Sequence, residues 1–442
     1  MLYFWIAGGP YGIEDAVSRG GAMLSMLVLV LYFVFWSFPQ ALMSAELSLM
    51  MPVNGGSIVW AQRAFGPFLG FLNAFFYVST NLVTAAMFVT LFIENVPLQP
   101  TLLSSSLMSL GFISLASVCN MWGVEFLNSI SMLTLFLILS PFVLECFLIV
   151  YFRVPIDFKG LVWFPQLTEV SLEDWNMMLG TIVWCSSGFD SVGSVAGEVG
   201  GDKKTFMVGV LMVFPLLVLN YFFPVMLAFI MENKIQNWDE NFFTTVAYKK
   251  FPFWFGVLVT LSSCISNFGQ LLNTIASQCR TIWAMAKGPE DNVALYRFLP
   301  RILSWSWQKN PADTGTPVFG VLICALVTFG LSFLSYDQLV QLNLFTQIVN
   351  LLLEYASLVR LKYTEPDTPR PFSVPFGKVG AILLGLPTLA LSVFSLATSE
   401  HIILIIGASF VGAGCLLYVV GMFLRYAIGD ENERPCKCCG GF

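Results

Sequence analysis

Two short polar interruptions lie inside long apolar stretches of this sequence, and an acidic residue follows each of them. The first is GGPYG at positions 8–12, with Glu14 two residues beyond it; the second is CSSGF at 185–189, followed directly by Asp190. Glycine and proline release backbone N–H and C=O groups from helical hydrogen bonding, and hydrocarbon cannot satisfy these groups. Released carbonyls attract an ammonium group, and released amides attract a carboxylate. The interruptions therefore indicate a binding site for a small cation or zwitterion.

A simpler explanation is that each glycine-rich cluster only kinks a packed helix. The pairing of two such clusters, each with a carboxylate beside it, favours a binding site over that alternative. The residues expected to form the site are Gly8, Gly9, Pro10, Tyr11, Gly12, Glu14, Ser187, Gly188, Phe189 and Asp190.

Three carboxylates are candidates for carrying a coupling proton: Asp190, Glu354 and Glu14. A charged side chain at the bilayer centre costs roughly 2.5–3.5 kcal/mol on insertion scales, so carboxylates at that depth usually have a function. Glu354 lies midway along an apolar stretch with no lysine or arginine nearby in the sequence; a hydrogen-bonded structural glutamate is the equal alternative. For Asp190 the alternative is a loop position at a span end, and for Glu14 a solvated vestibule position.

Membrane-spanning helices must hold these residues, because the composition excludes a soluble protein. Hydrophobic residues make up 57% of the 442 residues and charged residues only 11%, against about 25% charged in globular proteins. A helix that crosses the bilayer needs about 20 predominantly apolar residues. Twelve stretches approach this length: 2–17, 23–47, 68–95, 102–120, 126–152, 177–199, 205–231, 253–283, 316–334, 338–361, 379–397 and 401–426.

The two interrupted stretches are the first and the sixth of the twelve, which are matching positions in two five-helix halves. Paired interruptions of this kind are typical of transporters built from inverted repeats, whose substrate binds near the membrane midplane. The sequence predicts an all-α membrane protein with a five-plus-five inverted repeat, broken helices one and six, and two extra helices. The predicted divisions are the first repeat at 1–176, the second at 177–363, spans 11 and 12 at 364–428, and a cytoplasmic tail at 429–442.

Most lysines and arginines fall in loops on one side of this arrangement, and such residues favour the cytoplasm. We therefore expect both termini in the cytoplasm. The first stretch is too short before its interruption to cross a core of about 30 Å, so either the chain begins part-way through this helix or the half-helix is short. The tail residues Cys436, Cys438 and Cys439 allow palmitoylation, a zinc clip that lacks a fourth ligand, or an inert tail.

Two further acidic residues, Glu46 and Glu198, lie near predicted cytoplasmic span ends. Helix capping is the expected role for both. The alternative is a gate closed by ion pairs with Arg63, Lys203 or Lys204.

Enzymatic chemistry has little support in this sequence. With His401 as the single histidine, neither a histidine metal cluster nor a Ser-His-Asp arrangement can be assembled in the usual way. The sequence contains no P-loop or dinucleotide fingerprint. We predict no enzyme activity, metal, cofactor or nucleic-acid partner; the expected partners are the lipid bilayer, a small solute and H+. Uphill transport would draw on an ion gradient or on exchange of a second solute.

Several motifs give the chain a family resemblance. They are GGPYGIEDAV at 8–17, WSFPQAL at 36–42, PVNGG at 52–56, FGPF at 65–68, and AGE at 196–198 ahead of KKT at 203–205. Together they resemble the polyamine and L-type amino acid transporter group of the amino acid, polyamine and organocation (APC) superfamily. The likeness is closest to the polyamine uptake permeases of plants and trypanosomatid parasites, and it covers essentially the whole chain.

The resemblance implies a proton-coupled or exchange transporter with the APC fold. It places Trp184 where the family has an aromatic gate over the substrate, which adds this residue to the expected site; an ordinary core tryptophan is the alternative. Asp190 falls where related exchangers sense protons or contact the substrate. The Glu354-Tyr355 pair resembles the Leu-Glu-aromatic pattern of the polyamine group.

The chain also departs from the polyamine group. Thr84-Ala85 and Phe88 stand where that group has an Asp-Asn pair and a tyrosine, and Gly188 stands where it has an asparagine. The expected function is a plasma-membrane secondary transporter of polyamines or amino acids, coupled to protons and working by alternating access. The alternatives are a neutral or cationic amino acid exchanger and a non-transporting nutrient sensor of the same fold.

Overall fold

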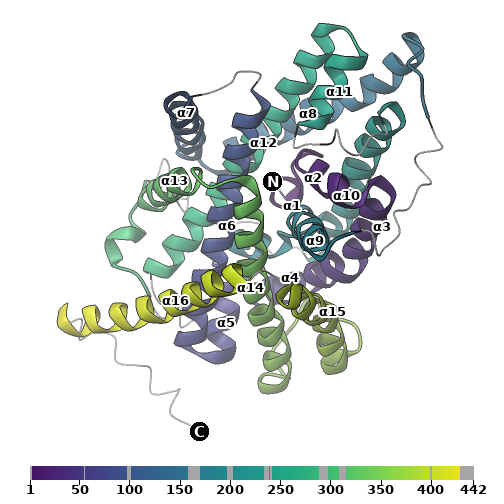
Figure 1. Ribbon diagram of the computed structural model, residues 1–442. Helices are drawn as coiled ribbons and strands as arrows, with labels where there is room; N and C mark the ends of the chain where they lie inside the picture. The colour runs from purple at the N-terminus through teal and green to yellow at the C-terminus, as the bar shows by residue number, and fades with distance from the viewer. Residues whose placement is uncertain are drawn as a thin grey trace.

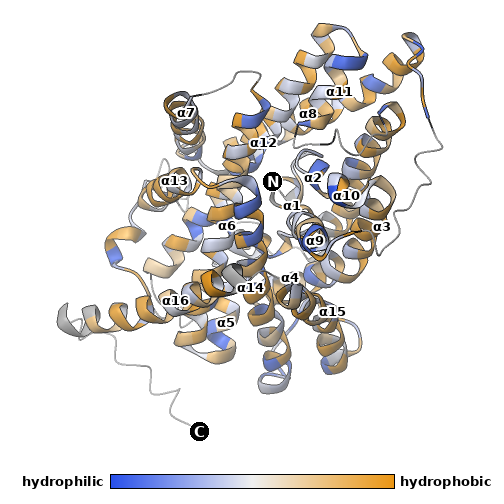
Figure 2. Ribbon diagram, viewed as in Figure 1, coloured by the Kyte–Doolittle hydropathy of each residue, from blue (hydrophilic) through white to orange (hydrophobic). Residues whose placement is uncertain are grey.

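The computed structural model describes residues 2–53, 55–96, 101–157, 170–196, 203–232, 238, 241–287, 297–307, 315–398 and 401–428. Within these residues the chain is almost entirely helical, and nine helices are long and apolar enough to cross a membrane. Hydrophobic residues cover most of the long helices (Figure 2). Backbone groups in hydrocarbon must be paired within their own segment, which a helix achieves. The expected all-α, multi-pass membrane protein is confirmed.

The α-helices in chain order are α1 (Leu2–Ile6), α2 (Glu14–Gly20), α3 (Ala22–Tyr32), α4 (Phe38–Met50), α5 (Ser57–Phe65), α6 (Pro67–Asn95), α7 (Leu102–Asn120), α8 (Val124–Tyr151), α9 (Leu172–Ser186), α10 (Lys203–Met231), α11 (Phe242–Lys250), α12 (Phe253–Lys287), α13 (Val318–Leu331), α14 (Tyr336–Thr364), α15 (Gly377–Thr398) and α16 (His401–Ile428). Among the remaining segments, η1 (Phe33–Ser37) is a π-helix, and η3 (Phe189–Val195) and η5 (Arg301–Ser304) are 3-10 helices. Strands β1 (Ser306–Trp307) and β2 (Thr316–Pro317) pair antiparallel, with Ser306 opposite Pro317.

Nine of the twelve predicted spans correspond to long helices, and the other three differ from a simple span. The first divides into α1 and α2, and the sixth is α9 followed by η3. The ninth, predicted at 316–334, is the 14-residue α13, because Thr316–Pro317 pair with β1 before the helix begins. A twelve-span inverted repeat, with the divisions proposed above, stays a prediction.

The centre of the bundle is α6, which packs against both α12 and α14, while α16 lies at the outside (Figure 1). Only 11% of the apolar window of α16 is buried, against 67% for α12. The buried face of α12 is strongly polar, the reverse of a helix in a soluble protein. Its buried polar residues are Thr260, Ser262, Ser263, Ser266, Asn267, Gln270, Asn273, Thr274, Ser277, Gln278, Arg280 and Thr281. This face meets the two broken spans.

Candidate functional site

The first interruption separates α1 from α2, as the sequence predicts. Gly8, Gly9 and Gly12 have φ values of +62°, +151° and +97°, which side chains other than glycine rarely adopt. The released groups find side-chain partners: the Gly8 carbonyl accepts a hydrogen bond from Ser266 Oγ at 2.8 Å, and the Gly12 N–H donates to Glu14 Oε2 at 2.6 Å. Glu14 therefore caps the interruption.

Packing holds this interruption from both sides. The Tyr11 hydroxyl donates to Ser262 Oγ on α12 at 2.9 Å. On the other side, the ring of Trp184 lies so close to Gly12 that a Cβ atom added there would come within 2.6 Å of it. Tyr336, at the start of α14, donates to the Gly12 carbonyl at 3.4 Å. The glycine is thus required both for its backbone conformation and for the contact with Trp184.

The second interruption lies between α9 and η3. The helix α9 ends at Ser186, Ser187 is extended, and Gly188 adopts a left-handed conformation with φ +113°. Two side chains from η1 hold this turn: Ser37 Oγ donates to the Ser186 carbonyl at 2.6 Å, and Trp36 Nε1 donates to Ser187 Oγ at 2.9 Å. A π-helical turn often marks a functional position, and here it brings two adjacent residues to the same break.

Asp190, just beyond the second break, belongs to a buried polar cluster. Gln40 Nε2 on α4 donates to Asp190 Oδ1 at 3.1 Å. Asn350 Nδ2 on α14 donates both to Asp190 Oδ2 at 3.3 Å and to Glu354 Oε1 at 2.9 Å. Asn73 on α6 in turn donates to Asn350 Oδ1 at 3.0 Å. In the part of the chain that the structure describes, no lysine or arginine forms an ion pair with either carboxylate.

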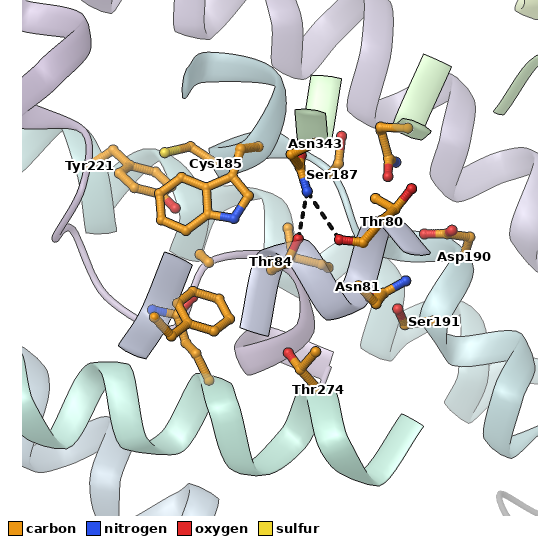
Figure 3. A pocket seen from close by; sticks show the side chains of 17 residues that line it. Thr80, Asn81, Thr84, Cys185, Ser187, Asp190, Ser191, Tyr221, Thr274 and Asn343 are labelled. Atoms are coloured by element: carbon orange, nitrogen blue, oxygen red, sulfur yellow. Dashed lines mark hydrogen bonds between the residues drawn. The ribbon is translucent and has the colours of Figure 1, made fainter. Parts of the chain in front are cut away.

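A cavity lies between the two interruptions. Its lining residues are Ile6, Ala7, Thr80, Asn81, Thr84, Phe88, Trp184, Cys185, Ser187, Gly188, Asp190, Ser191, Tyr221, Gln270, Thr274, Asn343 and Gln347. Figure 3 shows Thr80, Asn81, Asp190 and Ser191 grouped along one part of this lining. Asn343 Nδ2 donates to Thr84 Oγ1 at 2.7 Å and to the Thr80 carbonyl at 3.2 Å. Asp190 is the one ionisable carboxylate or amine among the described lining residues.

The structure brings the predicted site residues to one region but gives them different places. Those that line the cavity are Trp184, Ser187, Gly188 and Asp190. Those outside its described lining are Gly8, Gly9, Pro10, Tyr11, Gly12, Glu14 and Phe189; the end of α1 contributes Ile6 and Ala7 instead. Phe189 stacks on Phe214 with ring centroids 5.1 Å apart. Their role in binding stays a prediction.

The site expected from the sequence did not include α6, α12 and α14, although Thr84 and Phe88 on α6 were noted as departures from the polyamine group. Thr80 and Thr84 lie one turn apart on α6, and Asn343 and Gln347 lie one turn apart on α14. Polar residues four apart on an apolar helix share one face, so this spacing was a usable signal. Gln270, on the polar face of α12, also lines the cavity.

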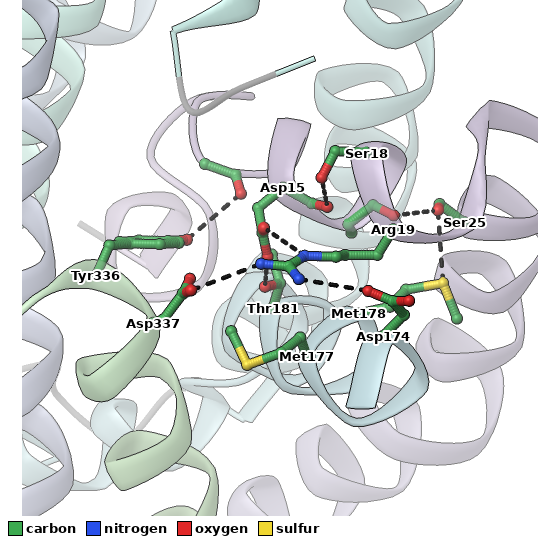
Figure 4. A network of polar contacts seen from close by, with 12 residues as sticks. Asp15, Ser18, Arg19, Ser25, Asp174, Met177, Met178, Thr181, Tyr336 and Asp337 are labelled. Atoms are coloured by element: carbon green, nitrogen blue, oxygen red, sulfur yellow. Dashed lines mark hydrogen bonds and ion pairs between the residues drawn. The ribbon is translucent and has the colours of Figure 1, made fainter. Parts of the chain in front are cut away.

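Arg19, at the end of α2, is the centre of an ion-pair network (Figure 4). Its guanidinium lies 3.3 Å from Asp15, 3.3 Å from Asp174 at the start of α9, and 3.6 Å from Asp337 at the start of α14. Thr181 also donates to Asp15 at 2.9 Å. The network therefore ties both interrupted spans to α14.

A second network, around Glu46, lies at the other end of α14. Glu46 is fully buried, and its carboxylate lies 2.9 Å from Lys362 Nζ and 3.1 Å from Arg370 Nε. It also accepts a hydrogen bond from the Val374 N–H at 2.6 Å. Glu46 thus forms gate-like ion pairs rather than only a helix cap.

The partners considered for Glu46 from the sequence are wrong where the structure can test them. Arg63 pairs with Glu365 instead, at 2.6 Å. Arg370, in the loop after α14, reaches Glu46. Local sequence spacing could not predict this contact. The other acidic candidate, Glu198, lies outside the described residues.

Comparison with known proteins identifies the family of the chain. The sequence matches the amino acid permease family over residues 2–423. It is similar to a probable polyamine transporter of Arabidopsis thaliana, with 26% identity over 426 residues that cover 92% of this chain and 81% of that protein. It is also 26% identical to the Arabidopsis thaliana polyamine transporter RMV1 (98% and 84% covered) and 25% identical to the Oryza sativa subsp. japonica polyamine transporter PUT1 (98% and 80%). The predicted resemblance is confirmed, and because the match spans nearly the whole chain, this protein belongs to the amino acid permease family.

Proposed function

We propose that this protein is a secondary active transporter of small organic cations, polyamines in particular, that works by alternating access with protons as coupling ion. The observation that carries the proposal is the charge of the cavity. Its described lining offers the carboxylate of Asp190 and no lysine or arginine. An ammonium group can form a charge-assisted hydrogen bond with that carboxylate. The carboxylate of an amino acid would find no cationic partner in this lining.

Aromatic side chains favour the same class of substrate. Trp184 and Phe88, whose ring centroids are 5.7 Å apart, line the cavity together with Tyr221. In Figure 3, Tyr221 and Asp190 appear on opposite sides of the view, with Thr84 between them. Ammonium groups are attracted to aromatic faces, and methylene groups pack against them. A diamine would place one ammonium at Asp190 and extend its chain toward the rings. The names of the plant relatives, which are polyamine transporters, support this choice.

The two ion-pair networks supply the gates for alternating access. Asp337 and Lys362 stand at opposite ends of α14, about 37 Å apart at a rise of 1.5 Å per residue. Each network joins α14 to a different set of helices, and the cavity lies between them. We propose that one network opens while the other stays closed. Trp184, which also contacts Tyr336, would close over the substrate at the Arg19 end.

Asp190, Glu354 and Glu14 are the proposed coupling residues, as the sequence suggests. Asp190 has the strongest case because it both lines the cavity and contacts Asn350. Glu354 is fully buried and connects to Asp190 through the same amide. Glu14 is occupied with the Gly12 N–H and is the weakest of the three. We place the protein in the plasma membrane with both termini in the cytoplasm.

Uptake of radiolabelled putrescine, arginine and leucine by a transport-deficient host, with and without a protonophore, tests this function. We expect putrescine uptake that the protonophore abolishes. Asp190→Asn should abolish putrescine uptake while leaving the protein in the membrane, and Glu232→Gln, which weakens an ion pair with Lys249 outside both networks, serves as a charge-matched control. Putrescine uptake that is absent in the wild type, or unchanged in Asp190→Asn, would reject the proposal.

A neutral or cationic amino acid exchanger is the second candidate. It is favoured by the uncharged polar groups of the lining, among them Thr80, Asn81 and Asn343, which can hydrogen-bond an amino acid. In this case leucine or arginine uptake would exceed putrescine uptake, would resist the protonophore, and would rise when the host is preloaded with amino acid.

A further inference from the structure

We propose that Asp190 and Glu354 are not two separate groups but one binding site for a single monovalent cation, a proton or a sodium ion, behind the substrate cavity. The role of this site in coupling rests on the proposed transport function, whereas the binding itself does not. The first support is geometric: the Nδ2 group of Asn350 donates to both carboxylates, at 3.3 Å and 2.9 Å. Four elements, α4, α6, η3 and α14, meet at this point.

Unused oxygen atoms provide an independent reason to expect a cation. Gln40 and Asn73 are fully buried, and their amide nitrogens already bind Asp190 and Asn350. Among the described residues, the oxygens Gln40 Oε1 and Asn73 Oδ1 accept no hydrogen bond, and the carboxyl group of Glu354 lies beside the Ser57 hydroxyl. A buried acceptor left unpaired is energetically unfavourable. Carboxylate and amide oxygens are the ligands that hard cations prefer, and a proton on a carboxyl oxygen would likewise supply a donor.

The charge of the cluster also requires a positive partner. Two carboxylates joined by one neutral amide repel each other, and buried charges are stable only when paired. Lys362, about two turns beyond Glu354 on α14, and Arg370 in the following loop are engaged with Glu46. The buried Arg280 on α12 donates to the Ala276 carbonyl. The other titratable groups that face the pair are the hydroxyls of Tyr77 on α6 and Tyr355 on α14, which carry no positive charge.

The position of the cluster connects this cation to the substrate. Asp190 lines the cavity, whereas Glu354 is fully buried and lies outside its described lining. One substrate ammonium group at Asp190 and one cation shared by the two carboxylates would together neutralise the pair. Because of the shared amide of Asn350, binding of the ammonium group is sensitive to binding of the cation, and the reverse also holds. The arrangement therefore favours symport, in which substrate and cation are bound together.

Thermal unfolding of the purified full-length protein in detergent, without substrate, tests the site. Sodium chloride is compared with choline chloride at equal ionic strength at pH 8, and pH 5.5 is compared with pH 8 in choline chloride. A sodium site raises the melting temperature in sodium but not in choline, because a ligand stabilises the state that binds it. A proton site raises the melting temperature at pH 5.5 relative to pH 8 in choline chloride.

Variants assign the response to the cluster. Glu354→Gln and Asp190→Asn should both lose the sodium-dependent or pH-dependent increase in melting temperature. Glu365→Gln, which removes a carboxylate that pairs with Arg63 outside the cluster, should keep it. If Glu354→Gln does not fold, the melting temperatures of Asp190→Asn alone test whether the response comes from the cluster. A response that is absent from the wild type, or equal in the wild type and both cluster variants, overturns the site. A response present without putrescine uptake would reject only the proposed substrate.

Discussion

The substitution Glu46→Gln removes one charge from the buried network at the Lys362 end of the molecule. In the wild type this carboxylate is fully buried and neutralises two cations, Lys362 at 2.9 Å and Arg370 at 3.1 Å. Glutamine keeps the shape of the side chain and one acceptor oxygen. The two cations would then lose their buried counter-ion. The expected result is a large loss of stability at this end.

The size of the loss follows from burial and from the remaining contacts. Removing one partner of a buried ion pair costs about 3–5 kcal/mol. The side chains of Lys362 and Arg370 are only 5% and 10% exposed, so water can replace little of the lost interaction. Both keep other partners: Lys362 donates to Ser373 at 3.0 Å, and Arg370 donates to the Leu361 carbonyl at 3.0 Å. We therefore expect the lower end of the range, about 3 kcal/mol.

Denaturant unfolding of the purified protein in detergent measures this loss, with Glu365→Gln as the matched control. The Arg63–Glu365 pair is as short, at 2.6 Å, but its side chains are 33% and 27% exposed. Exposed pairs contribute about 0–1 kcal/mol, so the control should lose no more than that. If Glu46→Gln and Glu365→Gln lower the free energy of unfolding equally, Glu46 is not held in a dry network and the reasoning from burial fails.

Three further predictions concern the breaks and the surface. Gly12→Ala should abolish uptake in protein that still reaches the membrane, because the φ of +97° and a Cβ atom 2.6 Å from Trp184 both oppose it; uptake per surface protein measures this. Trp36→Phe should lower the free energy of unfolding by about 1 kcal/mol through the lost indole hydrogen bond, as denaturant unfolding would record. Hydrogen bonding from Lys249 lowers the pKa of Glu232 below its usual 4.5, so this pair stabilises the folded state above pH 4.5 and is lost as pH falls further. Glu232→Gln should therefore be less stable than wild type at pH 7, by up to about 1 kcal/mol, and the difference in melting temperature should shrink below pH 4.5.

Much of the fold was predictable because a helix that crosses the bilayer needs about 20 predominantly apolar residues. Apolar length alone located nine helices, with ends that differ from prediction by a few residues in most cases. Glycine and proline clusters located both interruptions, because the backbone at Gly8 and Gly188 needs positive φ values. The ninth span was the clearest misjudgement of length, since the pairing of β2 with β1 shortens its helix. A two-residue strand leaves no periodic pattern to read.

The partners of the site residues were not predictable in the same way. Gln40 and Asn350, which hold Asp190, are 150 and 160 residues away from it in the chain. Their contact depends on how helices cross, and hydropathy does not encode crossing angles. Glu14 was expected to face the substrate; it caps the Gly12 N–H instead, because that released donor is the nearest group to its carboxylate.

Burial distinguishes the two proposed gates along α14 and predicts which of them opens first. Arg19 and Asp337 are 28% and 51% exposed, whereas Lys362 and Glu46 are 5% and 0% exposed. Breaking partly exposed pairs costs about 0–1 kcal/mol each, against about 3–5 kcal/mol for buried pairs. The end at Arg19 is therefore the easier one to open from the conformation described here. Because Asn343, Asn350 and Glu354 lie on the same helix between the gates, charge bound at the centre can bias which end opens. Alternation then requires that binding near Asp190 weaken the Glu46 network or strengthen the Arg19 network through the position of α14.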